Sequence, residues 1–600
     1  MSWLGHSRKV YESKRRLHIA QYKDRVNRIL QICSVIISLV TIACIICYHG
    51  LYISLPVKNL IRWVLYGSLL FYIAKYFTLL FYSLHRKEYI KRSWVEFVII
   101  CLLIIQFLSV VIFHFRFFST ENFENYYLLF IQVYFLVMVL VEMAKMSSSL
   151  GKYNLSPPIL MVLSFFILIC FGTILLMMPR MTYNGISFID ALFTATSASC
   201  ITGLSVVSTS GCFTVKGQIV IMILIQLGGM SILSFATFFT TFLARSSVGL
   251  RYQYMVRDMM STKLSDSFSL LRSIVITTFV IEAAGVILLY TYWKNTGFFV
   301  SDSENLFFSL FYTVSAFNNG GFVLIDKSLL ELGSAHSYFP QVIIMVLVFL
   351  GGIGFLTIRD FFSARYIRER KKYPWKSLMP QTKIVLITTL GLIIVCSVFF
   401  FFIEKDNALS VQETLFDKIF TAFFEIATCR TSGFMILDIR SMALPSVIMI
   451  IVLMFIGGSP GSTGGGIKTT TFFVMLKSVW ATVQGKKHIE FQHKTISYEL
   501  VDKASSIVTM TFSFVLISIF MLTLVEPTAS LQDAIFETTS AFATCGLSTG
   551  ICAEWNTMAK VVLILDMYIG RIGTLTLAFA LTRHKKESQH QYPDLYLMIG

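Results

Sequence analysis

The stretch LQDAIFETTSAFATCGLS at residues 531–548 decides the fold, because three other stretches of the chain share its pattern. Each has a phenylalanine ten positions before a glycine, and successive glycines are 118, 112 and 113 residues apart. The other stretches are FIDALFTATSASCITGLS (188–205), NLFFSLFYTVSAFNNGGFV (305–323) and LFDKIFTAFFEIATCRTSGFM (415–435). Self-similarity at a nearly fixed period indicates a fourfold internal repeat.

Each repeated stretch is too short to cross a membrane. Only about ten to fourteen helix-compatible residues precede each glycine, whereas a spanning helix needs roughly 20. The pattern therefore predicts re-entrant half-helices, each with an acid near its start, where the helix dipole favours negative charge: Asp190, Glu304, Asp417 and Asp533. Four helix C-termini on one axis would direct carbonyl groups and partial negative charge at a dehydrated cation.

Glycine suits the end of such a half-helix, because it allows backbone angles that turn a carbonyl group inward. Packing or turn glycines are the alternative, and they are commoner in membrane helices. Repetition at one offset favours an ion selectivity filter, with a dehydrated cation bound at the glycines. The expected filter residues are the glycines Gly203, Gly321, Gly433 and Gly546 and the residues before them, Thr202, Gly320, Ser432 and Cys545.

Composition places these repeats in a membrane. Hydrophobic residues make up 56% of the chain, the mean hydropathy is +0.72, and only 14% of residues are charged. An apolar run precedes each stretch, and another follows it near 218–243, 340–362, 443–476 and 557–582. We expect an all-α polytopic membrane protein with four helix, re-entrant pore loop, helix repeats around one pore. Their expected bounds are 157–250, 271–365, 383–480 and 503–585, followed by a cytoplasmic tail at 586–600.

Residues 1–156 form a separate region, a basic cytoplasmic tail followed by four apolar runs near 29–48, 62–82, 95–114 and 126–144. This topology resembles a voltage sensor, but the fourth run has no arginine ladder, so we expect a packing or assembly role. The basic linkers all fall on one side, which explains the net charge of +17 without nucleic acid. We expect twelve spans in the inner (plasma) membrane, with both termini cytoplasmic.

The stretch FIGGSPGSTGGGIKTTTF at 455–472 interrupts the apolar run of the third repeat. A helix cannot continue through so many glycines, and irregular backbone at membrane depth persists only where it lines protein or water. We expect a gate beneath the filter, formed by Gly457, Gly458, Pro460, Gly461, Gly464, Gly465, Gly466 and Lys468. The stretch superficially resembles a phosphate-binding loop, but Ile467 is an extra residue and no strand precedes it. With no catalytic constellation elsewhere, we expect no enzyme.

Arg571 stands in the fourth repeat where the other repeats have a glycine. An ionisable residue within a span is a functional candidate, and we assign Arg571 to the gate. A structural counter-ion for a buried acid or for loop carbonyl groups is the alternative. Glu282, Glu425 and Glu537 are further intramembrane acids, and we expect the last two to brace the filter.

The motifs SAFNNGGF (315–322), TCRTSGF (428–434), ETTSAFATCGLSTGI (537–551) and IGRIGTLTLAFAL (569–581), with the glycine-rich stretch, resemble the TrkH, KtrB and HKT superfamily of K⁺ transporters. The resemblance covers about 157–585 and is greatest to the Ktr type. It implies a K⁺ filter, an intramembrane loop that obstructs the pore near Arg571, a homodimer, and cytoplasmic nucleotide-binding regulatory subunits of the RCK type.

The same resemblance implies that K⁺ is the transported ion and that this chain needs no organic cofactor. Members with serine at the first filter position tend to admit Na⁺, so Gly203 favours K⁺. A Na⁺-permeable transporter of the same fold stays an alternative, as does a non-conducting membrane scaffold or sensor.

Overall fold

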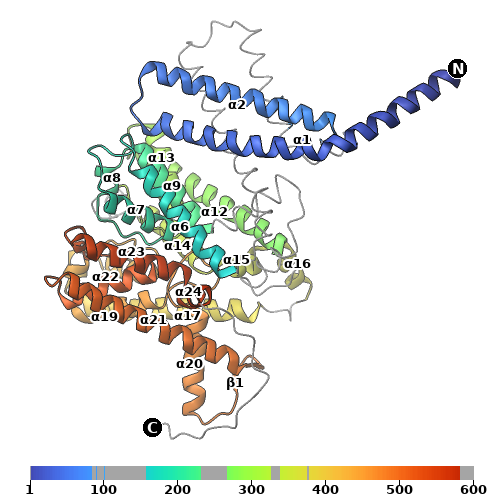
Figure 1. Ribbon diagram of the computed structural model, residues 1–600. Coiled ribbons are helices and arrows are strands. Elements are labelled where there is room, and N and C mark those ends of the chain that lie inside the picture. Colours follow the sequence, from blue (N-terminus) through green and yellow to red (C-terminus); the bar gives the residue numbers. More distant parts are fainter. Residues whose placement is uncertain are drawn as a thin grey trace.

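A computed structural model describes residues 2–83, 90, 97, 100–101, 157–230, 267–325, 338–373 and 378–581 (Figure 1). Nearly all regular structure in these ranges is helical. The exception is a short antiparallel hairpin in which β1 (Ile489–Phe491) pairs with β2 (Lys494–Ile496). The prediction of an all-α fold is therefore confirmed.

Six helices of the described ranges are long and apolar enough to cross a membrane. They are α1 (Ser2–Gly50), α2 (Leu55–Phe81), α6 (Pro157–Leu176), α12 (Ser267–Thr296), α17 (Pro380–Glu404) and α21 (Tyr498–Val525). Two bent helix pairs raise the number of candidate spans to eight. Apart from residues 97, 100 and 101, the expected spans near 95–114 and 126–144, and residues 231–250 of the first repeat, lie outside the described residues.

Four short helices stand where re-entrant half-helices are predicted. These pore helices are α7 (Phe188–Cys200), α13 (Asp302–Phe317), α18 (Leu415–Thr428) and α22 (Leu531–Ala543). Each begins at a serine or threonine whose side chain accepts a backbone N–H bond of the first turn: Ser187, Ser301, Thr414 and Ser530. An acid in each first turn completes the favourable N-terminus, so the predicted half-helices are confirmed.

In the second, third and fourth repeats the second helix is shorter than its apolar run predicts, and in the first repeat this helix is described as far as Met230. These helices are α9 (Val215–Met230), α14 (Phe339–Gly352), α19 (Leu444–Phe455) and α23 (Thr557–Ile572). In the second repeat the chain bends by 104° into α15 (Phe355–Phe362), and in the fourth by 91° into α24 (Thr574–Leu581). Gly354 and Gly573, with φ of +86° and +89°, make these bends, since residues with side chains rarely adopt such angles.

The third repeat has the longest interruption. Between α19 and α20 (Thr469–Val483) the chain leaves the helix for residues 456–468. The predicted break in the helix of this repeat is thus confirmed. The apolar runs of the second and fourth repeats, by contrast, do not form single straight helices. Short elements complete the described fold: α8 (Thr209–Cys212), α16 (Ala364–Lys372), and the 3-10 turns Ala408–Val411, Ile439–Ser441 and Ile551–Ala553.

The N-terminal helices α1 and α2 form a hairpin along one edge of the bundle (Figure 1). Hydrogen bonds between Thr41 and Ser68, at 3.1 Å, and between Ser38 and Tyr72 join them. The hairpin contacts the first repeat where the Arg180 amide donates to a carbonyl near the end of α1. The helix α1 is continuous from Ser2, so it includes the basic residues before the first apolar run as well as that run.

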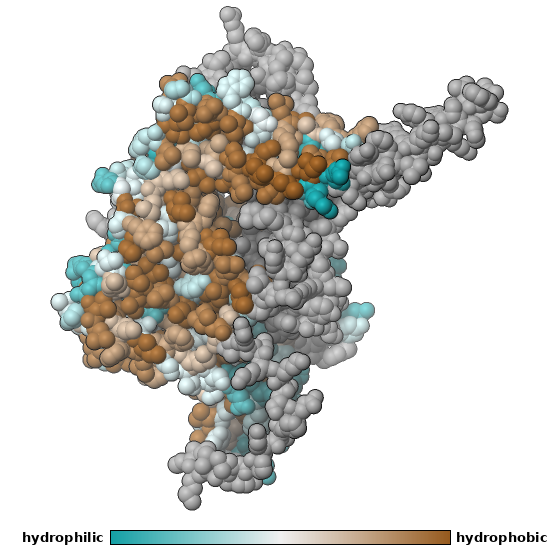
Figure 2. All heavy atoms as spheres, in the orientation of Figure 1, coloured by the Kyte–Doolittle hydropathy of each residue, from teal (hydrophilic) through white to brown (hydrophobic). Residues whose placement is uncertain are grey.

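The surface of the bundle is largely apolar, as Figure 2 shows over the long helices. Large side chains such as Phe279, Ile394 and Phe520 are 48–63% exposed on these helices. The buried side chains gather around the pore helices, with Phe193, Phe311 and Phe536 among those with no exposed surface. Apolar residues on the outside as well as the inside are typical of a bundle that faces lipid.

Candidate ion pathway

The four repeat glycines all have backbone conformations in the left-handed region. Their φ angles are +87°, +68°, +65° and +90° for Gly203, Gly321, Gly433 and Gly546. An L-residue with a side chain rarely adopts these angles, so each position requires glycine for a backbone reason. A turn at the same place in all four repeats is what the filter interpretation demands.

These glycines form a closed ring in sequence order. A methyl group on Gly203 would lie 3.0 Å from the Cα atom of Gly321, and one on Gly433 would lie 3.0 Å from that of Gly546. A methyl group on Gly546 would in turn lie 3.0 Å from Gly203, which closes the ring. Each such methyl group would also meet the carbonyl oxygen of the residue before the next glycine, namely Gly320, Ser432, Cys545 and Thr202. The structure brings all eight predicted filter residues together.

Three of the pore helices end in the same turn, two residues before the ring glycine. The residues there, with φ of +59°, +58° and +50°, are Ile201, Asn319 and Thr544. In each, the next amide donates to a carbonyl five residues earlier, as from Thr202 to Ser197 at 2.8 Å. This Schellman turn satisfies the last carbonyl groups of the helix. In α18 the corresponding amide of Ser432 donates to Thr428 instead, at 3.1 Å.

Two buried glutamates hold the chain that follows the ring. Glu425 on α18 accepts hydrogen bonds from the backbone amides of Ile436 and Leu437. Glu537 on α22 accepts from the Thr549 amide at 2.7 Å and from its hydroxyl at 3.0 Å. Both glutamates thus tie a pore helix to the segment after its ring glycine, as the sequence predicts.

Glu282 lies elsewhere, at the junction of the first two repeats. Its carboxylate accepts from the Gln226 amide at 3.2 Å and from the Asn318 amide at 3.1 Å. Since Asn318 directly follows α13, the three residues join α9, α12 and the end of a pore helix. Hydrogen bonds to both carboxylate oxygens satisfy a group that is costly to bury alone.

The glycine-rich segment of residues 457–466, which we call the gate loop after the role expected from the sequence, lies against the ring. A methyl group on Gly464 would lie 2.6 Å from the Thr431 side chain, and one on Gly465 would overlap the Thr544 hydroxyl. Thr431 and Thr544 stand two residues before ring glycines. The gate loop therefore approaches the pore-helix ends so closely that side chains would not fit at these points.

Backbone hydrogen bonds tie the gate loop to the bend of the second repeat. The Ser459 amide donates to the Gly352 carbonyl at 3.0 Å, and the Phe355 amide donates to the Gly461 carbonyl at 3.0 Å. These contacts also satisfy polar groups that the breaks in both helices leave free. The loop is thus an ordered element that bridges the second and third repeats.

Arg571 reaches the gate loop from the fourth repeat. Its guanidinium donates to the carbonyl of Thr463 and, at 2.6 Å, to that of Gly228 on α9. Of the two roles considered for this residue, these contacts agree with binding of loop carbonyl groups. Arg571 thereby connects the gate loop to helices of the first and fourth repeats.

Two further cations, one buried and one half-buried, hold the same loop. Arg430, which is 5% exposed, donates to the Gly457 carbonyl at 2.9 Å, and Lys468 donates to the Gly464 carbonyl at 2.7 Å. Among the residues that the structure describes, neither of them nor Arg571 forms an ion pair. The loop carbonyl groups are therefore the partners that stabilise this positive charge.

The second glycine marker of the repeats has a packing role. Methyl groups on Gly228, Gly351 and Gly570 would overlap the carbonyl oxygens of Ser199, Phe317 and Phe542, each four residues before a ring glycine. These glycines let the second helix contact the end of the pore helix. In the third repeat, Gly457 instead meets Gly465 of the gate loop.

Sequence reasoning did not identify Arg430, Asn319 or the bends at Gly354 and Gly573. Asn319 donates to the Thr463 hydroxyl at 2.9 Å and so adds another contact from a pore-helix end to the gate loop. A charge three residues before a ring glycine is a signal that could have drawn attention to Arg430.

Comparison with known proteins identifies relatives of this chain. Residues 128–592 match the family model described as TrkH, cation transport protein. Ktr system potassium uptake protein B of Bacillus subtilis is 36% identical over 448 residues, which cover 74% of this chain and 97% of that protein. The potassium/sodium uptake protein NtpJ of Enterococcus hirae is 32% identical over 458 residues, covering 75% and 98%.

A solved structure supports the fold. The potassium transporter TrkH from Vibrio parahaemolyticus aligns with a TM-score of 0.57 and 17% identity, covering 82% of this chain and 98% of that one. The fold and these similarities define a multi-pass membrane transporter of cations rather than an enzyme. The chain belongs to the TrkH family of cation transport proteins.

Proposed function

We propose that the chain is the pore-forming subunit of a K⁺ uptake system, with K⁺ passing through the glycine ring. The closed ring of positive-φ glycines carries this proposal. Each glycine lies beside the carbonyl group that precedes the next one, which is the arrangement that lets backbone oxygens replace the water around a cation. The names of the Ktr relatives, potassium uptake proteins, support the choice of ion.

The gate loop is proposed to control this pathway. It lies against the pore-helix ends, and three cations bind its carbonyl groups. A cation that leaves the ring would meet this positive charge before it could cross. Displacement of the loop and of Arg571 would remove both the steric and the electrostatic barrier.

Permeation of Na⁺ is the second candidate function. It is supported by the name of one relative, a potassium/sodium uptake protein. A non-conducting scaffold or sensor is the third. Growth of cells without other K⁺ uptake separates the scaffold from the transporters, since only a conducting chain restores growth at limiting K⁺. Uptake of K⁺ and Na⁺ into vesicles with the purified chain then gives the selectivity.

The assembly that we propose is a homodimer in the inner membrane, with both termini cytoplasmic and RCK-type nucleotide-binding subunits bound there. The four pore repeats keep the bounds 157–250, 271–365, 383–480 and 503–585, and residues 1–156 have a packing or assembly role. Affinity purification of the full chain from its own cells, followed by crosslinking, tests these partners. Recovery of monomer alone would contradict the dimer.

A further inference from the structure

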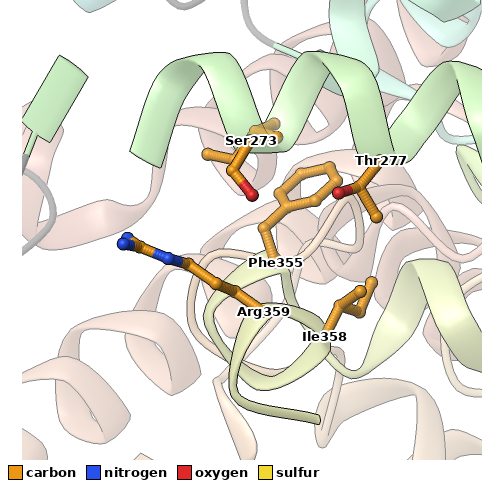
Figure 3. Close-up of a pocket in the computed structure, with 6 residues that line it drawn as sticks. Ser273, Thr277, Phe355, Ile358 and Arg359 are labelled. Atoms are coloured by element: carbon orange, nitrogen blue, oxygen red, sulfur yellow. The ribbon is translucent and has the colours of Figure 1, made fainter. Parts of the chain in front are cut away.

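A small cleft lies between α12 and α15, away from the ring. Ser273, Ile274 and Thr277 line it from α12, and Phe355, Ile358 and Arg359 line it from α15. Figure 3 shows the Ser273 and Thr277 side chains on the side of α12 that faces α15, with the Arg359 side chain directed past Ser273 and away from Thr277. Two hydroxyl groups and a guanidinium form a set of donors suited to an oxyanion.

The cleft lies where the apolar part of α12 begins. Ser273 directly follows Arg272, the last charged residue before the uncharged run of α12 that continues to Ile281. On the other side, the 104° bend turns α15 away from the direction of α14. A guanidinium beside the start of an uncharged apolar run stands at the level of lipid headgroups.

Arg359 has no partner of its own among the residues that the structure describes. Arg370 on the neighbouring α16, by contrast, donates to the carbonyl of Asp360 at 2.7 Å and lies 3.4 Å from its carboxylate. Asp360 is buried and also accepts from the Met379 amide at 2.9 Å. Within the part of the chain that the structure describes, the local acid is therefore already engaged and leaves the charge of Arg359 unpaired.

The surroundings favour a lipid over a soluble anion. Phe361 and Phe362, which follow Arg359 on α15, are 47% and 59% exposed. The next helix, α16, reads ARYIRERKK and so carries a strong positive charge. Exposed aromatic residues beside clustered basic residues are typical of a surface that contacts anionic headgroups.

The α12 surface beside the cleft is apolar as well. Ile276, Phe279 and Val280 are 46–61% exposed next to the two hydroxyl groups. The cleft itself encloses only about 10 Å³, space for a single oxygen atom rather than a whole small molecule. A headgroup phosphate could insert one oxygen while its acyl chains lie along α12.

We propose that Ser273, Thr277 and Arg359 bind the headgroup phosphate of an anionic phospholipid. The guanidinium neutralises the phosphate, and the hydroxyl groups donate to the oxygen in the cleft. Phe355, at the start of α15, also donates its amide to the gate loop. The lipid would thus bind one helical turn from a residue that holds this loop.

The test is native mass spectrometry of the full chain in micelles with phosphatidylcholine and increasing phosphatidylglycerol. The wild-type chain should retain phosphatidylglycerol selectively. Arg359→Gln should weaken its binding about fivefold and Ser273→Ala about twofold. Arg368→Gln, a charge on α16 that does not line the cleft, should leave the affinity unchanged. If Arg359→Gln does not insert, Arg359→Lys replaces it, with a smaller loss expected.

Several results would overturn the proposal. If a folded Arg359→Gln chain binds phosphatidylglycerol with wild-type affinity, Arg359 does not form the site. If Arg368→Gln loses as much affinity as Arg359→Gln, the lipid is attracted by the general positive charge of this surface instead. Equal retention of phosphatidylcholine would exclude selection of negative charge. Inorganic phosphate that displaces phosphatidylglycerol at low millimolar concentration would make a free anion the ligand. None of these measurements depends on ion transport.

Discussion

The Lys560 ammonium lies 2.8 Å from the Asp190 carboxylate, although 370 residues separate them in the chain. Lys560 is near the start of α23, and Asp190 is in the first turn of α7. The pair therefore joins the fourth repeat to the first at the N-terminal ends of the two helices. The hydroxyl of Tyr338 donates to Asp417 in the same way between the second and third repeats.

Loss of the Lys560 charge should weaken this contact between the fourth and the first repeat and so destabilise the protein. The two side chains are only 13% and 22% exposed, so Lys560→Met leaves a carboxylate with little water around it. We expect a loss of about 1–2 kcal/mol, seen as a lower thermal midpoint of the full chain in detergent. Lys405→Met is the control, because the Lys405–Asp406 side chains are 49% and 84% exposed. Equal midpoints for both variants would contradict the prediction.

Gly203→Ala should impair selectivity. The methyl group would lie 2.7 Å from the Gly320 carbonyl oxygen, and alanine at a φ of +87° costs about 1–2 kcal/mol. Distortion of the ring should lower the ratio of K⁺ to Na⁺ uptake in vesicles about tenfold or more. Gly391→Ala on α17 is the matched control, since no atom lies within 4 Å of its added methyl group. An unchanged ratio in folded Gly203→Ala would remove Gly203 from the filter.

The neighbouring glycines Gly351 and Gly352 should differ sharply in their tolerance of alanine. A methyl group on Gly351 would overlap the Phe317 carbonyl, whereas one on Gly352 would meet its nearest atom at 3.7 Å. We expect Gly351→Ala to destabilise the protein by about 1–3 kcal/mol and Gly352→Ala to have little effect. Thermal midpoints of the inserted proteins measure this, and similar values for the two would show that the second helix can move away.

The sequence predicts the ring well, because a positive φ combined with the close approach of a neighbouring carbonyl oxygen favours glycine at this position in every repeat. The bends at Gly354 and Gly573 escape the same reasoning. Apolar residues continue through them, and a single glycine within a helix costs only about 1 kcal/mol, so hydropathy alone does not indicate an end. Both do follow the packing glycines Gly351 and Gly570 by three residues, a regularity that the repeat contains.

Contacts between repeats could not be predicted in the same way. Lys560 resembles any basic residue near the end of a span, and nothing local connects it with Asp190. The partners of Arg571 are carbonyl groups, which every residue has, so their identity depends on how the loop folds. The sequence indicates that a buried charge needs a partner, and the fold determines which one.

Arg571→Ala should open the pathway. The change removes a charge that binds the Thr463 and Gly228 carbonyl groups beside the ring. We expect severalfold higher K⁺ flux per inserted protein and an unchanged ratio of K⁺ to Na⁺ uptake, because the ring glycines are untouched. Arg571→Gln, which retains donors without the charge, separates electrostatics from hydrogen bonding. Folded Arg571→Ala with flux at or below the parent level would end the assignment of Arg571 to the gate.

Shortening the gate loop should have an effect that overlaps with that of Arg571→Ala. Deletion of residues 461–463 removes the Thr463 carbonyl to which Arg571 donates, so both changes break one contact. We expect the deletion to raise K⁺ flux. In the double variant, the increase in flux should be smaller than the product of the two single-variant increases. Flux and inserted protein are measured for all four chains in the same vesicles. Fully multiplicative effects would show that the loop and the arginine restrict the pathway independently, each at its own point.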